Sequence, residues 1–273
     1  MRKIAFVALA LLGWCATPAS ALEITNRRAT YGPDGSARAD NKLMLGDVLV
    51  LAFDIEDLKM EPHSGIVRYT NRLELLDSTG KVIFTRDTPN QRVLCLGKSR
   101  VAERAQVVVG TDQAPGKYTL RLTVSDVATK TAKGNAESKS FTYDFQAVPP
   151  GFGLIHVNAP SVATTTKEYT GTCSLVGMAL DSKKMINVEI RTRILDEKGK
   201  PTLTKPFVLN FPEMLPPGFN VTKDTQIPLP FPLSLNRPGR FTIEIEAEDA
   251  VGKRTAKVSF PIVVLEPSAV GAP

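Results

Sequence analysis

The chain is poor in the residue types on which catalytic sites most often depend. Its 273 residues include only two histidines, His63 and His156. A Ser/His/Asp or Cys/His hydrolase needs one of them beside a nucleophile. Neither belongs to a recognisable motif, and the sequence contains no GxSxG, HExxH or P-loop pattern. We therefore expect ordinary loop and strand histidines in a non-catalytic protein, and an enzyme ranks third among the functional interpretations.

The sequence also lacks an apolar run long enough to cross a membrane. The N-terminal run Ile4–Trp14 has about eleven residues, whereas a membrane-spanning helix needs roughly 20. It follows Arg2 and Lys3 and precedes the small residues Ala19-Ser20-Ala21, which is the pattern of a secretory signal. We expect residues 1–21 to be removed. The product would then be soluble and exported, whether periplasmic, cell-surface or secreted.

Loss of residues 1–21 would leave a mature chain beginning at Leu22. The bulky Trp14 directly before Cys15 argues against a lipoprotein, where a small residue is expected. The formal net charge would fall from +6 to +4 because Arg2 and Lys3 leave with the signal. That charge is too weak to indicate nucleic acid as a partner.

Tryptophan and cysteine become scarcer still in the mature chain. The only tryptophan is lost. Three tyrosines are not assigned to alternating strands, and they are too few for a platform on which sugars stack: Tyr31, Tyr69 and Tyr169. Cys95 and Cys173 remain, one in each half, so a disulfide would have to join modules or subunits. We favour two free or buried thiols, because Cys173 lies in an apolar strand.

Two stretches of the chain are nearly identical in pattern. Pro115–Asp126 and Pro238–Asp249 each begin with a Pro-Gly turn, alternate apolar and polar residues, and end at an aspartate. Two further pairs keep the same order: Leu73–Lys81 with Thr192–Lys200, and Phe141–Phe145 with Phe260–Val264. The chain is therefore predicted to be a duplicated module.

Many short strands, separated by Gly, Pro and Asp, indicate an all-β fold of two tandem Ig-like antiparallel β-sandwich domains. The predicted divisions are a signal at 1–21, domain one at 22–148, a Pro/Gly linker at 149–151, domain two at 152–266 and a flexible tail at 267–273. In domain one the strands are expected at Ile24–Arg28, Val48–Ile55, Val67–Leu76, Val82–Thr85, Gln106–Val109, Tyr118–Val124 and Phe141–Ala147.

The stretch Ile227–Leu233 alternates apolar residues with three prolines. Proline is tolerated in sheets mainly at an edge, where its missing N–H faces solvent. We predict an edge strand protected against pairing with other chains. A PxxP-type ligand is the alternative, but Leu229, Phe231 and Leu233 are expected in the core.

The repeated Pro-Gly strand, with Lys117 or Arg240 and then Tyr118 or Phe241, resembles the end of bacterial Ig-like and fibronectin-III-like repeats of exported proteins. The resemblance covers both modules. It implies the sandwich fold and export, and it transfers no site residue. The chain differs from antibody-type domains, because the mature protein has no core tryptophan. Tyr118 can anchor its corner through a hydroxyl, whereas Phe241 cannot.

Carboxylates gather at the end of one predicted strand, at Asp54, Glu56 and Asp57, and Asp126 ends another. Such loop ends can bind calcium, which takes several oxygen ligands, but no calcium-loop spacing occurs. We predict neither a metal nor a cofactor.

The outward charges of the two modules differ. In module two, Arg191 and Arg193 would face acidic residues across the strands: Glu244, Glu246 and Glu248. In module one, Arg68, Arg72 and Glu74 would face Lys117 and Arg121, leaving a mostly basic face.

We predict that residues Arg68, Arg72, Lys117 and Arg121 form a partner-binding face for an acidic protein or an anionic cell-surface polymer. The loop Val127–Ser138, longer than its counterpart, is a second candidate surface. The predicted function is a non-catalytic structural or protein-interaction module of the cell envelope or extracellular space. A binding module for an anionic glycan is the alternative.

Overall fold

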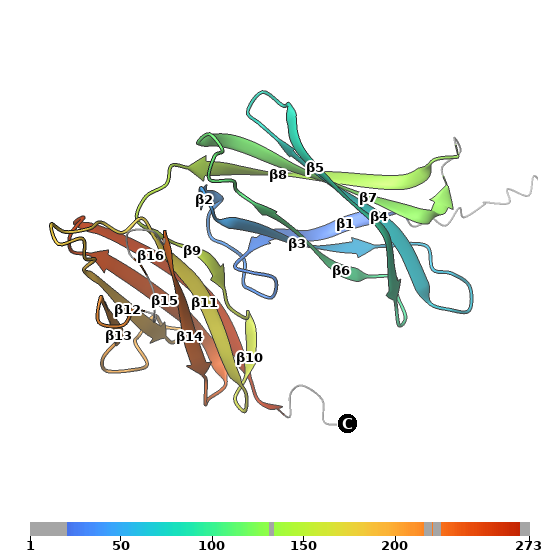
Figure 1. Ribbon diagram of the computed structural model, residues 1–273. Coiled ribbons are helices and arrows are strands. Elements are labelled where there is room, and N and C mark those ends of the chain that lie inside the picture. Colours follow the sequence, from blue (N-terminus) through green and yellow to red (C-terminus); the bar gives the residue numbers. More distant parts are fainter. Residues whose placement is uncertain (1–20, 131–133, 216–219, 221–224, 268–273) are drawn as a thin grey trace, which may run out of the picture.

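The computed structural model describes residues 21–130, 134–215, 220 and 225–267 (Figure 1). The predicted signal and tail lie outside these residues, apart from Ala21 and Pro267. The described residues form sixteen β-strands and contain no α-helix, which confirms the all-β prediction. No helix in this part of the chain has the length and apolarity to cross a membrane.

The first module is built from eight strands: β1 (Glu23–Thr30), β2 (Lys42–Met44), β3 (Val48–Glu56), β4 (Ile66–Leu76), β5 (Val82–Leu94), β6 (Val101–Val108), β7 (Gly116–Lys130) and β8 (Ala136–Val148). One sheet has the order β1-β3-β6 and the other β2-β8-β7-β4-β5. A single core cluster takes side chains from both sheets, so the two sheets form a sandwich.

The second module repeats this arrangement strand for strand: β9 (Gly153–Asn158), β10 (Val162–Thr164), β11 (Glu168–Val176), β12 (Val188–Leu195), β13 (Phe207–Phe211), β14 (Gln226–Ser234), β15 (Gly239–Asp249) and β16 (Arg254–Leu265). Its sheets have the orders β14-β11-β9 and β10-β16-β15-β12-β13. The equivalence of β1–β8 with β9–β16 shows that the sequence repeat is a repeat of the whole fold.

Not every strand pair is antiparallel. The short strands β2 and β10 run parallel to β8 and β16, respectively. Three residues are too few to show a period-two pattern, so the sequence did not reveal these strands. The other paired strands are antiparallel, as predicted.

The repeated Pro-Gly strands, β7 and β15, form the centre of the two five-stranded sheets. Their inward residues are buried as the alternation predicts, because successive side chains of a strand point to opposite faces. The Tyr118 hydroxyl donates to the Ala114 carbonyl at 2.7 Å, which is the predicted tyrosine corner. In β15 the ring of Phe241 instead lies 5.2 Å from the Arg237 guanidinium.

The proline-rich strand β14 is an edge strand, because it pairs only with β11. Its apolar residues are buried and its prolines are exposed: Ile227, Leu229, Phe231 and Leu233 point inward. Proline cannot donate a ladder hydrogen bond, so these positions direct their backbone toward the free edge. The edge-strand prediction is confirmed.

Strands β5, β6 and β7 are longer than predicted. Strand β5 extends to Leu94, and β6 begins at Val101. Strand β7 continues past Asp126, which was expected to end it. Bulges at Ile83 and near Asn90 interrupt the alternation of β5, and its side chains are largely exposed on both faces, so the pattern is weak there.

Candidate functional site

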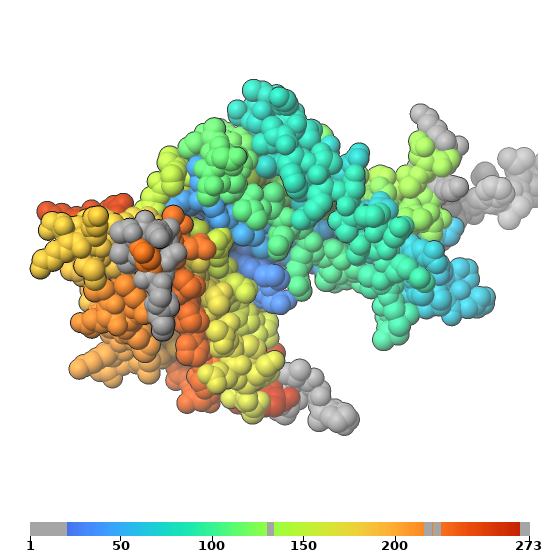
Figure 2. Space-filling view, viewed as in Figure 1, coloured from blue at the N-terminus to red at the C-terminus, as the bar shows by residue number. Residues whose placement is uncertain are grey.

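The two modules meet where residues 31–47 of the first contact residues 153–162 of the second (Figures 1 and 2). Tyr31 belongs to the first module in sequence, but its side chain packs in the core cluster of the second. It is 7% exposed, and its ring centroid lies 6.0 Å from that of Phe260. Burial raises the pKa of Tyr31 above its ordinary value, and the nearby Arg38 guanidinium partly opposes that shift.

A tight loop after Tyr31 brings the two backbones together. Gly32 has a φ of +80°, and a Cβ at this position would lie 2.1 Å from Oδ1 of Asn158. Only glycine combines this conformation with such close approach. The N–H and the hydroxyl of Ser161 both donate to the Asp34 carbonyl at 2.8 Å. The loop is therefore hydrogen-bonded to the second module.

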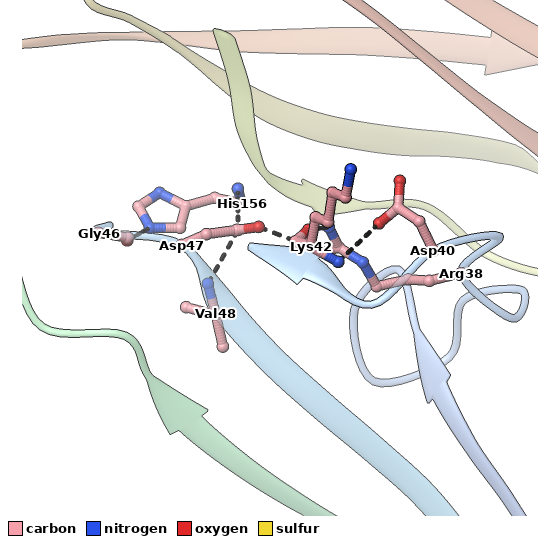
Figure 3. A network of polar contacts seen from close by, with 7 residues as sticks. All are labelled: Arg38, Asp40, Lys42, Gly46, Asp47, Val48 and His156. Atoms are coloured by element: carbon pink, nitrogen blue, oxygen red, sulfur yellow. Dashed lines mark hydrogen bonds and ion pairs between the residues drawn. The ribbon is translucent and has the colours of Figure 1, made fainter. Parts of the chain in front are cut away.

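A buried carboxylate forms the polar part of the junction (Figure 3). Asp47 is 3% exposed and accepts hydrogen bonds from the backbone N–H groups of Val48 and His156, each at 2.8 Å. Arg38 forms an ion pair with it at 3.2 Å. These donors compensate for the loss of water around the charge, which would otherwise be costly.

His156 contributes through its ring as well as its backbone. Its φ is +53°, and Nε2 lies 2.6 Å from the Gly46 carbonyl oxygen (Figure 3). A carbonyl can only accept, so Nε2 carries the proton. The predicted strand histidine is therefore an inter-module contact. His63 lies instead in a turn between β3 and β4, with a φ of +68°.

A mostly apolar cleft of about 520 Å³ lies beside this network. Both modules line it, including Met44, Leu45, Ile155 and Met178. The described residues that line it carry no ionisable side chain. The cleft can therefore accept an apolar group, but its described lining offers no acid, base or charged nucleophile.

The charge balance predicted for the outer face of the first module is wrong. Three of the four basic residues form ion pairs: Arg68 with Glu61 at 2.5 Å, Arg72 with Asp87 at 2.8 Å and Arg121 with Glu74 at 2.8 Å. Glu61 lies before β4 and Asp87 lies on β5, so alternation along β4 and β7 could not predict the pairs that these two carboxylates form. Lys117 lies toward the other end of the sheet, opposite Gln146. Partner binding by these four residues stays a prediction.

Hydroxyl groups, rather than charges, dominate the outer surface of β7 and β8. The hydroxyl oxygens of Thr123 and Ser140 are 2.7 Å apart, and those of Ser125 and Ser138 are 2.8 Å apart. These cross-strand pairs link the two strands side by side. The predicted loop Val127–Ser138 is largely strand, because β7 runs to Lys130 and β8 begins at Ala136. Residues 131–133 between them lie outside the described residues.

The predicted charge pairing of the second module is confirmed. Arg191 lies 3.0 Å from Glu248, and Arg193 lies 3.5 Å from Glu246. Glu244 instead pairs with Lys257 at 2.7 Å. The outer faces of the two modules therefore differ: the second carries a ladder of ion pairs, whereas the first combines ion pairs with cross-strand hydroxyl pairs.

The carboxylates considered for calcium bind groups of the protein itself. Asp54 contacts Asn26 and Arg100, both at 2.5 Å. Asp126 accepts three hydrogen bonds, from the N–H groups of Lys59 and Ala128 and from the Thr129 hydroxyl. Burial raises the pKa of Asp54, but the bonds from Asn26 and Arg100 outweigh it and hold the pKa below its ordinary value. No group of three metal-binding side chains converges within the residues that the structure describes.

Both cysteines are buried, unpaired thiols, as favoured from the sequence. They lie in the cores of different modules, and burial raises the pKa of Cys173 to about 12. Tyr69 is fully buried and its hydroxyl donates to Glu103 at 2.6 Å, so it offers no sugar platform. Tyr169 is half-buried and contacts Thr164.

Sequence patterns did not reveal Tyr31, Arg38 or Asp47 as the centre of the junction. The Gly-Pro-Asp-Gly turn after Tyr31 marks a loop, but no local pattern shows that this loop enters the other module. That information comes only from how the two sandwiches lie against each other.

No family model and no curated protein matches the chain. The red sea bream transglutaminase structure is similar at 8% identity and a TM-score of 0.29, covering 89% of this chain and 31% of that one. The latent PorU dimer of Porphyromonas gingivalis is similar at 11% identity and a TM-score of 0.36, covering 95% and 21%. This chain thus spans less than a third of either protein's length.

The fibronectin(III)-like modules of CbhA from Clostridium thermocellum are similar over 92% of this chain and 98% of theirs, at 12% identity and a TM-score of 0.24. At these identities and TM-scores, the likenesses carry no functional information. What the described residues establish is an all-β protein of two duplicated β-sandwich modules joined through Tyr31 and Asp47.

Proposed function

We propose that the protein is an exported, non-catalytic interaction module whose two sandwiches act as one rigid unit. The observation that carries this proposal is the burial of Tyr31 in the core of the other module. Linked domains usually move relative to one another unless a substantial apolar contact holds them. The His156 N–H of the second module donates to the buried Asp47 carboxylate of the first, which also pairs with Arg38, so a polar contact joins the modules as well. A rigid pair presents surfaces of both modules in a constant arrangement.

Export rests on the N-terminal pattern of Arg2, Lys3 and the apolar run that follows. The test is to express the full chain in a bacterium, fractionate the cells and measure the N-terminal mass. We expect a product outside the cytoplasm that begins at Leu22. A cytoplasmic product that keeps residues 1–21 would refute export.

The interaction role is tested by crosslinking in the producing cell. A photo-crosslinkable residue is placed at an exposed position of each module, and any captured protein is then purified and its affinity for the full chain measured. We expect a partner whose binding is weaker in Tyr31→Ala than in Tyr31→Phe, which keeps the ring. If no captured protein binds the purified chain, the proposed function is wrong.

The anionic-glycan alternative is the weaker candidate. It rests on a mostly basic face, and three of the four basic residues of that face each have a carboxylate partner: Arg68, Arg72 and Arg121. Exposed pairs of this kind leave little net charge to attract a polyanion.

A further inference from the structure

Strands β5 and β6 are the last strands of their sheets, and they lie on the same side of the first module. The Arg86 side chain reaches from β5 and donates to the Gln106 carbonyl of β6 at 3.0 Å. Between the strands is a groove of about 550 Å³. The sandwich is thus open along this side, where the teal strand β5 is at the surface (Figure 2).

The groove is accessible and mostly apolar, and four polar residues also line it: Arg86, Gln106, Asp112 and Gln113. Ile83, Phe84 and Val108 line it and are 45%, 43% and 60% exposed. Leu75 and Val107 are buried residues that also line it. Large apolar side chains grouped at this exposure usually mark a contact surface.

The duplicated fold supplies an internal comparison for the β6 edge. Its counterpart β14 has prolines opposite Ser174, Thr172 and Thr170 of β11. The same register in the first module sets Ala102, Arg104 and Gln106 opposite Asp54, Ala52 and Val50 of β3.

These three residues of β6 therefore correspond to Pro228, Pro230 and Pro232. In β14 the prolines leave no N–H on the outer edge, whereas β6 keeps its donors there. The contact from Arg86 shows that the Gln106 carbonyl points outward. The outer edge of β6 therefore retains both donors and acceptors.

Strand β5 is less suited to accept another strand. It contains Pro89, and bulges at Ile83 and near Asn90, whose φ is +55°, break its ladder. Such features are typical of protected edges, so the open edge of this side is β6.

We propose that the β6 edge and its groove bind an extended segment of a partner polypeptide by strand addition, with alternate apolar side chains in the groove and a carboxylate against Arg86. Strand addition supplies main-chain hydrogen bonds, and the groove supplies side-chain selectivity. The described residues place no carboxylate in an ion pair with Arg86, so an acidic residue of the partner would complement it. A second copy of the chain fits less well, because a symmetric pairing would bring Arg86 of both copies to one edge.

This inference rests on the proposed interaction function and names the partner class and the binding site. The probe is a fluorescein-labelled nine-residue peptide of alternating valine and threonine with one central glutamate. Its binding to the purified full chain is followed by anisotropy. The test variant is Arg104→Pro/Gln106→Pro, which copies two prolines of β14 onto β6. The matched control is Arg28→Ala, on β1 at the opposite edge of the same sheet and outside the groove.

We expect the double-proline variant to bind at least about tenfold more weakly, since it loses two backbone donors, and the control to bind as the unaltered chain does. Arg86→Ala should weaken the glutamate peptide more than its glutamine version. Thermal unfolding checks that the variants fold. If the double-proline variant folds and binds equally well, or if the unaltered chain binds no peptide, the inference is wrong.

Light scattering over a concentration series tests the second-copy alternative. A dimer that the two prolines abolish would overturn the inference in favour of self-association. Crosslinking in the cell separates this inference from the proposed function. Undiminished capture of a partner by the double-proline variant refutes the β6 edge as the site and leaves the function standing, whereas no partner for the unaltered chain refutes the function.

Discussion

Asp126 of the first module and Asp249 of the second occupy the same position in the repeated strand, and both carboxylates are fully buried. Asp126 accepts from the Lys59 N–H at 2.8 Å, and Asp249 accepts from the Ala179 N–H at 3.1 Å. Lys59 lies in the loop between β3 and β4, and Ala179 lies in the equivalent loop between β11 and β12. Each aspartate therefore joins that loop to the hairpin of the last two strands.

Asp249→Asn is expected to destabilise the protein by about 2–4 kcal/mol, because an amide NH₂ would face N–H donors and leave Arg254 without its buried partner, 2.6 Å away. Asp126 pairs with N–H and hydroxyl donors and not with an arginine, so Asp126→Asn should lower the unfolding free energy by about 1–3 kcal/mol. Urea unfolding measures both free energies. The control, exposed Asp112→Asn, should change stability by less than about 0.5 kcal/mol. If neither variant loses more unfolding free energy than this control, the two carboxylates do not hold the loop to the hairpin.

The same carboxylate predicts a pH dependence. Burial raises the pKa of Asp249, but hydrogen bonds from Gly252, Arg254 and Ala179 outweigh it and hold the pKa below its ordinary 3.8. A lowered pKa in the folded state stabilises the fold above 3.8, and this contribution is lost as pH falls through the folded value. The stability gap between the unaltered chain and Asp249→Asn should therefore narrow below about pH 4. Melting curves from pH 7 to 3 test this, and a gap that widens in acid would contradict it.

Tyr31→Ala should loosen the junction, because it removes a ring from the second module's core while leaving that module's own strands intact. We expect a loss of about 2–4 kcal/mol and separate unfolding transitions for the two modules. Calorimetry resolves the transitions, and small-angle scattering measures the change in overall dimensions. Tyr31→Phe keeps the ring and is the control. One unshifted transition in Tyr31→Ala would show that the ring does not couple the modules.

Gly171→Ala is expected to destabilise the second module. The ring of Phe231 lies over Gly171 on the neighbouring strand, and a Cβ there would be 2.0 Å from a ring carbon. The ring must shift within a packed core, which costs about 1–3 kcal/mol. Gly151→Ala is the matched control, because a Cβ at Gly151 meets no atom within 4 Å. Equal unfolding midpoints for the two variants would contradict this account.

Replacing the three prolines of β14 with threonine should restore donors to its outer edge. The inward residues are unchanged, so we expect the fold to persist and self-association to increase with concentration. Light scattering at several protein concentrations measures the change. A variant that stays monomeric like the unaltered chain would mean that the prolines do not protect this edge.

Local sequence determined the sandwich strands and their inward faces. Tyr118 and Phe241 were recognisable as core residues because alternation along a strand is a local property with a period of two. The prolines of β14 were equally informative, since a missing N–H restricts a residue to an edge wherever the strand lies. Strands β2 and β10 escaped prediction because three residues carry no period.

Tertiary structure alone decided the contacts between distant segments. Arg72 looked uncompensated until the long strand β5 brought Asp87 beside it. Tyr31 looked like a loop tyrosine until the second module enclosed it. Such contacts depend on how sheets and modules lie against one another, and no local period encodes that arrangement. The duplicated sequence therefore determined what each module is, whereas the three-dimensional arrangement decided how the modules join and which edge stays open.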